Sequence, residues 1–174
     1  VGETTTMGLV PQVADSVQIP VVAAGGIGDG RGLAAALALG AQGVQMGTRF
    51  VCSEECIAHT AYKEKILKAR DRSTVVTGQT TGYSLRCLEN KLTRQFVEME
   101  KAGATKEELD LFGRGRVYQG LIEGKLEEGS LVAGQIAGLI KEIKPVKHII
   151  EEMVAEAEAL LAQLNGLHTE VQRG

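Results

Sequence analysis

Two short apolar runs near the start of the chain each end in a glycine-rich break. Their apolar residues carry no alternation, which is typical of strands in a parallel sheet buried on both faces, and they predict strands over 19–24 and 43–47. The alanine-rich stretch between them predicts a helix over 30–39, with Asp29 as its N-cap and Gly40 at its C-terminal end. The order strand, turn, helix, strand predicts two parallel strands that end side by side.

Helical spacing of apolar residues recurs along the rest of the chain. It predicts helices over 5–17, 54–70, 89–102, 105–112, 116–123 and 129–142, and a last helix that follows Pro145 and frays from about residue 165. Thr4 to Thr6 offer hydroxyl N-caps to the first helix, and Pro11 falls near its first turn. One outlying strand is predicted over 73–77, with a polar loop over 78–82.

The pattern therefore divides the chain into a first part, in which helices and strands alternate, and a second part that is mostly helical. We expect an α/β fold class, with residues 1–72 supplying βα units and their loops, residues 73–165 a mostly helical segment, and residues 166–174 a frayed tail. The glycine-rich breaks after the two strands can bring bare backbone N–H groups onto one phosphate. In an eight-stranded α/β barrel the loops after the seventh and eighth strands commonly build such a site.

Composition narrows the function classes. The chain has 174 residues, 44% of them apolar and 24% charged, and a net charge of −3, so neither a basic nucleic-acid surface nor aromatic base stacking is indicated. Three cysteines do not make a disulfide framework, which favours a cytoplasmic location. The apolar runs all fall short of the roughly 20 residues of a membrane helix, so no membrane partner is expected.

Several polar residues allow more than one interpretation. Cys52, Cys56 and His59 share the i, i+4, i+7 spacing of one helix face, but a fourth ligand is missing nearby, so we expect buried cysteines and no metal site. Cys52 follows the second glycine break and could be a nucleophile if a helix N-terminus lowered its pKa, which is the less favoured interpretation. Arg49 could neutralise a phosphate or an acyl-carrier partner, or brace the rim in an ion pair.

Small residues four apart in the predicted helix 129–142 suggest a close approach to another helix or to a ring. They are Ala133, Gly134, Ala137 and Gly138, and packing is the favoured interpretation. Ser130 is expected to be the N-cap of this helix.

Motifs along nearly the whole chain, to about residue 165, resemble the flavin-dependent enoyl-acyl-carrier-protein reductase II family. Its close relatives are the nitronate monooxygenases, once called 2-nitropropane dioxygenases. The resemblance is carried by Thr4-Thr5-Thr6-Met7 with Pro11, Ala24-Gly25-Gly26-Ile27 with Asp29-Gly30, Gln45 to Phe50, Ala58-His59, Lys63 to Ala69, Asn90 to Thr93, Gly129-Ser130 and Ala133 to Gly138. The Ala-Gly-Gln segment and the helices from residue 89 onward favour the reductase branch.

The resemblance implies the C-terminal part of a TIM-type (β/α)8 barrel that binds FMN at the carboxyl ends of its strands, followed by a mostly helical segment. The implied FMN-binding residues are Ala24, Gly25, Gly26, Gln45, Met46, Gly47, Thr48 and Gln135. The phosphate would be held by backbone amides after strands seven and eight and by the Thr48 hydroxyl. Gln135 would reach the flavin or substrate pocket.

The implied activity is hydride transfer from NAD(P)H through FMN to an enoyl thioester on acyl carrier protein, in fatty-acid elongation. The alternatives are a nitronate monooxygenase, in which reduced flavin meets oxygen, and a non-catalytic FMN- or phosphate-binding half-barrel. The family carries a catalytic Gly-Gly-His just ahead of the segment that begins here at Val1, so no catalytic residue is expected within this chain.

A partial barrel has open strand edges and an uncovered sheet face. We therefore expect this chain not to be an independent monomer. It should associate with the missing N-terminal half, associate with another copy of itself as a homo-oligomer, or belong to a longer polypeptide.

Overall fold

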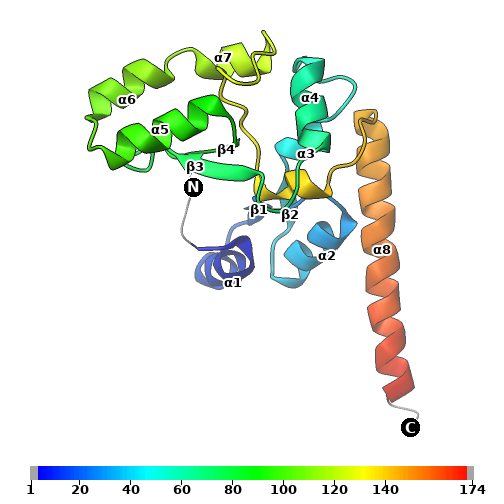
Figure 1. Ribbon diagram of the computed structural model, residues 1–174. Helices are drawn as coiled ribbons and strands as arrows, with labels where there is room; N and C mark the ends of the chain where they lie inside the picture. Colours follow the sequence, from blue (N-terminus) through cyan, green and yellow to red (C-terminus); the bar gives the residue numbers. More distant parts are fainter. Residues whose placement is uncertain (1–3, 172–174) are drawn as a thin grey trace. The chain divides into compact units, whose positions relative to one another are not determined.

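The computed structural model describes residues 4–171, the last five of them (167–171) as helical backbone alone. These residues fall into two compact units (Figure 1). We call residues 47–143 the hairpin unit, and the segments up to residue 46 and from residue 144 the βαβ unit. The boundary expected near residue 72 falls inside the hairpin unit.

The βαβ unit contains the predicted strand, helix, strand order. Its elements are α1 (Thr6–Ser16), β1 (Val22–Ala24), α2 (Gly30–Ala38), β2 (Gly43–Gln45) and α8 (Val146–Val171). β1 and β2 pair in parallel, which confirms the predicted strand pair, although both strands are shorter than predicted. Helix α8 follows Pro145 as predicted and continues to Val171, past the point where fraying is expected.

Two details of α1 differ from the prediction. Thr5 is the N-cap residue, but its side chain makes no capping hydrogen bond. Pro11 lies inside α1 and not near its first turn. A proline there removes one backbone donor from the helix, so α1 depends on its packing against the rest of the unit.

Helices α2 and α8 pack very closely where α2 begins (Figure 1). A Cβ atom added to Gly30 would lie 2.5 Å from the Met153 carbonyl oxygen and 2.7 Å from the Ala157 nitrogen, both backbone atoms of α8. Met153 and Ala157 are themselves buried, with Ile149, on the face of α8 that this contact covers. The rest of the core of the unit is small, comprising Val10, Ala23, Ile27, Ala36 and Ala41.

The hairpin unit is built from short helices around one antiparallel hairpin (Figure 1). Its elements are α3 (Thr48–Val51), α4 (Thr60–Leu67), β3 (Thr74–Thr77), β4 (Leu85–Leu88), α5 (Lys91–Lys101), α6 (Lys106–Gly113), α7 (Arg116–Leu121) and the 3₁₀ helix η1 (Gln135–Leu139). The outlying strand and the helices α5, α6 and α7 are confirmed. The short helix α3 and the strand β4, which pairs with β3 from Thr74 opposite Leu88 to Thr77 opposite Leu85, were not predicted.

The helix predicted over 54–70 is wrong for its first third, because α4 begins at Thr60. Between residues 53 and 59, side chains form hydrogen bonds with backbone groups that would otherwise pair within a helix. The Ser53 hydroxyl accepts a hydrogen bond from the Cys56 amide at 3.2 Å. The buried Lys63 ammonium donates to the Ser53 and Cys56 carbonyl oxygens at 2.6 and 2.7 Å. Such bonds compete with helix formation.

The helix predicted over 129–142 is wrong as well, since only η1 is helical and Ser130 caps no helix. Residues 130–134 are extended and pair with β4: the Leu88 amide donates to the Leu131 carbonyl at 2.8 Å, and the Ala133 amide to the Arg86 carbonyl at 3.0 Å. Tyr62 donates its hydroxyl hydrogen to the Val132 carbonyl. The small side chains at 133 and 137 are buried as core residues and not as a helix-packing stripe.

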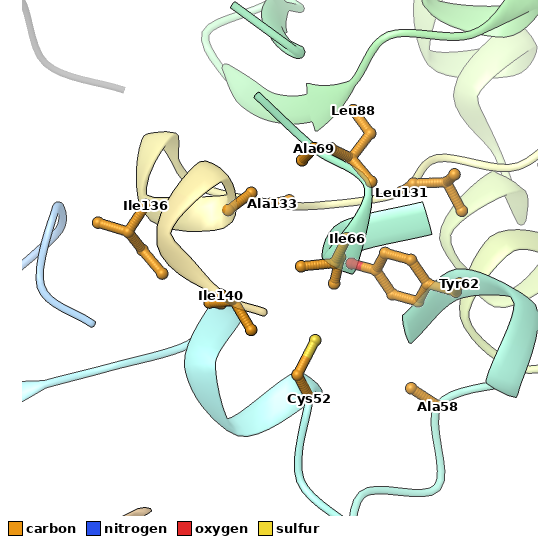
Figure 2. Packing of buried hydrophobic residues seen from close by; sticks show 11 residues of the cluster. Cys52, Ala58, Tyr62, Ile66, Ala69, Leu88, Leu131, Ala133, Ile136 and Ile140 are labelled. Carbon is orange, nitrogen blue, oxygen red and sulfur yellow. The ribbon is translucent and has the colours of Figure 1, made fainter. Parts of the chain in front are cut away.

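The core of the hairpin unit gathers around Tyr62, Ile66, Leu88 and Leu131, each at most 2% exposed (Figure 2). It is supplied by α3, α4, β4 and the extended segment that ends in η1. Cys52 points into this cluster and is completely buried.

Candidate functional site

The carboxyl ends of β1 and β2 lie side by side. Their parallel register sets Ala24 opposite Gln45, so the first glycine break and the residues that follow β2 leave the sheet at matching positions. Ala24, Gly25, Gly26 and Gln45 are all exposed. The strand ends therefore present backbone to solvent at the edge where parallel α/β sheets bind ligands.

The turn after β1 depends on glycine for its conformation. Gly25 and Gly26 have φ values of +97° and +76°, which residues with a Cβ rarely adopt. A Cβ added to Gly26 would meet nothing within 4 Å, so the space over this turn is open. The Thr6 hydroxyl donates to the Gly25 carbonyl at 2.7 Å and fixes the turn from α1. The sequence offered Thr6 only as a helix cap, and nothing in its spacing pointed to this contact.

The backbone amides at the N-terminus of α2 already donate hydrogen bonds to carboxylates of this chain. Asp29 accepts a hydrogen bond from the Gly32 amide at 3.2 Å, as predicted for an N-cap, and Glu156 of α8 accepts from the Gly30 amide at 2.7 Å. Burial acts to raise the pKa of Asp29, but hydrogen bonds from Arg31 and Gly32 outweigh it, so the net shift of this pKa is downward. A phosphate near β1 is therefore left with the amides of the glycine turn and not with those of α2.

Residues Gln45 to Thr48 cross from the βαβ unit into the hairpin unit. The Met46 side chain packs against the small core of the βαβ unit, which leaves its backbone as the part able to contact a ligand. Gly47 is exposed, is the N-cap residue of α3, and would have an added Cβ in open space.

Thr48 and Gln135, far apart in sequence, belong to one neighbourhood of the hairpin unit. The Thr48 hydroxyl oxygen accepts a hydrogen bond from the Gly134 amide at 2.9 Å, and Gln135 is the next residue, with an exposed side chain. An oxygen that accepts this bond keeps its own hydrogen free to donate, so Thr48 remains able to bind an anion. Spacing alone gave no sign of this contact.

The Arg49 side chain is buried and makes a structural contact within the hairpin unit. It is 7% exposed and donates from Nη1 to the Glu142 carbonyl at 3.0 Å, so it ties α3 to the end of the hairpin unit. Of the two interpretations given above for Arg49, the structure supports a bracing contact. The partner is a backbone carbonyl and not the carboxylate of an ion pair.

The cysteines are free thiols, and Cys52 is unsuited to nucleophilic chemistry. Burial raises the pKa of Cys52 to about 11, although Arg49 and Lys63 act to lower it, so the reactive thiolate is scarce near neutral pH. Because residues 52–59 are not one helix, Cys52, Cys56 and His59 do not share a helix face; the His59 Nδ1 atom instead accepts from the Ala61 amide at the start of α4. Within residues 4–166 no group of three potential metal ligands is found.

Most of the chain matches a known protein family. The nitronate monooxygenase family model matches residues 1–156. The chain belongs to the nitronate monooxygenase family. A search for long apolar helices found none in the described part of the chain that could cross a membrane.

Three relatives show the range of this family. The structure of FabK from Thermotoga maritima is 50% identical, with a TM-score of 0.92 over 96% of this chain and 53% of its own. A probable nitronate monooxygenase of Bacillus subtilis is 36% identical over 86% of this chain and 43% of its own length. A carboxyl-CoA dehydrogenase of Mycobacterium tuberculosis, named for an octahydroindene substrate, is 32% identical over 90% of this chain and 55% of its own length.

The chain thus spans about half the length of these relatives. The likeness to FabK, a TIM-type barrel, confirms the predicted fold class, the C-terminal part of such a barrel followed by a mostly helical segment. It also confirms the reductase II and nitronate monooxygenase resemblance, and with it membership of an oxidoreductase family.

Proposed function

We propose that this chain is part of an FMN-dependent reductase that transfers a hydride from NAD(P)H to an enoyl thioester carried by acyl carrier protein. The observation that supports this most is the likeness to FabK, which extends over nearly the whole chain at half identity. The Mycobacterium tuberculosis relative, named for a CoA thioester, supports a thioester as the class of substrate.

The residues present fit the phosphate of FMN. Ala24, Gly25 and Gly26 present exposed backbone at the end of β1, and the conformation of this turn requires glycine. Gln45 and Met46 end or follow β2, and Gly47 and Thr48 come next along the chain with open space and a hydroxyl that can donate. We assign the phosphate to the two strand ends of the βαβ unit and, from the resemblance alone, propose that Gly47 and Thr48 also contact it and that Gln135 reaches the ring. FMN, when bound, supplies the hydride chemistry, while the protein orients it.

FMN titration of the full chain, followed by flavin fluorescence, tests the cofactor assignment. Thr48→Val removes the hydroxyl and is expected to weaken FMN binding about tenfold or more, because a hydrogen bond to a charged group contributes about 1.5–3 kcal/mol. Thr48→Ser keeps the hydroxyl and is the matched control. Saturable binding that Thr48→Val leaves unchanged contradicts this role for Thr48, and absence of binding contradicts the FMN assignment for the chain alone.

A nitronate monooxygenase is the second candidate, favoured by the family model and by the Bacillus subtilis relative. The two activities are separated by substrate. A crotonyl thioester should stimulate NAD(P)H consumption by a reductase, whereas a nitronate should stimulate oxygen uptake by a monooxygenase. The assay uses the chain together with the remaining half of the barrel, which we propose as its partner.

A different class of function is a half-barrel that binds FMN or phosphate without catalysis. FMN binding with neither activity, in the presence of the remaining half, would favour it over both enzymes. NAD(P)H oxidation recovered on adding that half would exclude it.

A further inference from the structure

A cavity of about 300 Å³ lies within the hairpin unit, among β3, the β3–β4 loop and helices α5, α6 and α7. None of the eight predicted site residues lines it. Its size is at the lower end of the range for small-molecule pockets, which suits a short chain or a single ring better than a flavin or a dinucleotide.

The inner wall of the cavity is apolar. Leu92 and Leu109 are 4% and 0% exposed, and Phe96 lies beside them, held by its contact with the Phe112 ring at 5.8 Å between centroids. Two wall hydroxyls have partners within the unit: Thr81 donates to the Gly78 carbonyl at 2.9 Å, and Thr93 to the Asn90 carbonyl at 3.0 Å. This wall therefore favours a hydrocarbon ligand.

The rim of the cavity also carries apolar side chains, and their exposure to water is unfavourable. Tyr83, Leu85 and Val117 all line the cavity and are 74%, 41% and 42% exposed. Asp110 and Arg114 also line it and are exposed, so a charged or polar end of a ligand has groups to meet outside the apolar part.

The loop that forms one side of the cavity is fixed in place. Glu100 of α5 accepts hydrogen bonds from the Gly78 amide at 3.2 Å and from the Thr80 amide at 3.1 Å. Gly78 has φ +75°, and an added Cβ would lie 2.6 Å from the Tyr83 carbonyl oxygen. The cavity is thus largely preformed, which lowers the entropic cost of binding.

One extended segment joins the cavity to predicted site residues of the same unit. Residues 131 and 133 face the core, so Ser130, Val132 and Gly134 share the opposite face of this strand-like segment. Ser130 lines the cavity, Val132 is 38% exposed, and Gly134 donates to the Thr48 hydroxyl. Four residues of extended chain span about 13 Å.

We propose that this cavity binds the hydrocarbon tail of an acyl thioester. The identification of the ligand as a thioester rests on the proposed function; the preference for a hydrocarbon chain rests on the cavity itself. A methylene group is similar in size to a water molecule, which occupies about 30 Å³. A cavity of about 300 Å³ therefore holds a chain of roughly eight to ten carbons.

The test is a chain-length series of saturated N-acetylcysteamine thioesters, from butanoyl to dodecanoyl, titrated into the full chain by calorimetry. Saturated thioesters cannot be reduced, so binding is measured without chemistry. Affinity is expected to rise about three- to fourfold for each added methylene and to level off at roughly eight to ten carbons. Affinity that does not depend on chain length would overturn the proposal.

Two tryptophan variants of α7 localise the binding. Val117→Trp fills the rim of the cavity and should move the plateau to shorter chains and weaken decanoyl binding at least tenfold. Tyr118→Trp changes the neighbouring residue, which is 59% exposed and does not line the cavity, and should bind as the unchanged chain does. Equal binding by both variants would place the ligand elsewhere and overturn the assignment.

Failure of this proposal is distinguishable from failure of the proposed function. Crotonyl-dependent NAD(P)H oxidation by the assembled enzyme, with no chain-length dependence in the thioester series, rejects the tail site alone. Chain-length-dependent binding that Val117→Trp weakens, with neither FMN binding nor reduction, rejects the reductase and leaves a hydrocarbon site.

Discussion

At the scale of single residues, Gly30 is the described glycine of the βαβ unit with the least room for a side chain. Gly30→Ala would place a methyl group against the α8 backbone at 2.5 Å, where no flexible side chain can yield. We expect the free energy of unfolding to fall by about 2–3 kcal/mol, the upper part of the range for overpacking. Urea denaturation of the purified chain measures it.

Gly8→Ala is the matched control for Gly30→Ala. Gly8 also lies in a helix of the βαβ unit, but its added Cβ would meet only the Thr4 and Thr5 side chains, at an ordinary 3.7 and 4.0 Å. Since alanine favours helix by about 1 kcal/mol over glycine, this variant should be as stable as the unchanged chain or more so. Similar losses in both variants would contradict the close contact between α2 and α8.

The thiols should differ in reactivity. Cys52 and Cys87 are buried, and burial raises the pKa of each to about 11, whereas Cys56 is partly exposed. A raised pKa means less thiolate at any pH below it, so at pH 8 iodoacetamide should label Cys56 first. Peptide mass spectrometry identifies the labelled residue, and labelling of all three in urea is the control. Early labelling of Cys52 would show that the core around Tyr62 opens readily.

At the scale of elements, the cap of α5 also joins it to another part of the unit. Asn90 is 1% exposed; its side-chain oxygen accepts from the Thr93 amide, and its side-chain nitrogen donates to the Leu126 and Gly129 carbonyls at 2.7 and 2.8 Å. Asn90→Ala removes the cap and leaves these carbonyls without that donor, so we expect a loss of about 3 kcal/mol. Thr105→Ala, at the exposed cap of α6, should cost about 1 kcal/mol in the same denaturation experiment. Equal losses would mean that the two carbonyl bonds contribute nothing.

Sequence pattern predicted the elements whose signals are local and missed those that depend on distant partners. Helices α5 and α6 were predicted from apolar spacing, which is a local signal, and in the structure each begins with a capping box that spans only four residues, from Asn90 and from Thr105. The segment 130–134 has helical spacing, yet its amides and carbonyls pair with β4, a strand that few residues mark. Likewise, Lys63 takes the carbonyls of residues 53 and 56 from seven or more positions away.

The same distinction applies to the candidate site. The glycine turn at 25–26 could be predicted from sequence because two glycines follow an apolar run, and their φ values of +97° and +76° are ones that residues with a Cβ rarely adopt. The bond from Gly134 to Thr48 joins residues 86 positions apart, and only folding shows it. The cavity of the hairpin unit was missed because its wall residues come from five helices and strands and from the segments between them, each of which supplies few of them.

At the scale of the whole molecule, the βαβ unit exposes several large apolar side chains that are not part of its small core. Met7, Ile19 and Val22 are 68%, 70% and 58% exposed, and α8 adds Ile150, Val154 and Leu164. β1 and β2 form a two-stranded sheet, so within the described residues each has one edge that no other strand pairs. Parallel sheets are normally covered on both faces, and open edges attract further strands.

We therefore expect the isolated chain to associate, either with a polypeptide that carries the remaining barrel strands or with another copy of itself. Light scattering after size exclusion should give a mass above the 18.5 kDa of one chain, and the apolar dye ANS should bind. Adding the remaining half should abolish dye binding, because strands of that half would cover Val22 and the sheet edges. Val22→Lys places a charge on this surface and should weaken association, while Arg72→Glu, at a side chain of the hairpin unit that is 97% exposed, is the control. A monodisperse 18.5 kDa particle that binds no dye would mean that the exposed surface is stable in water without a partner.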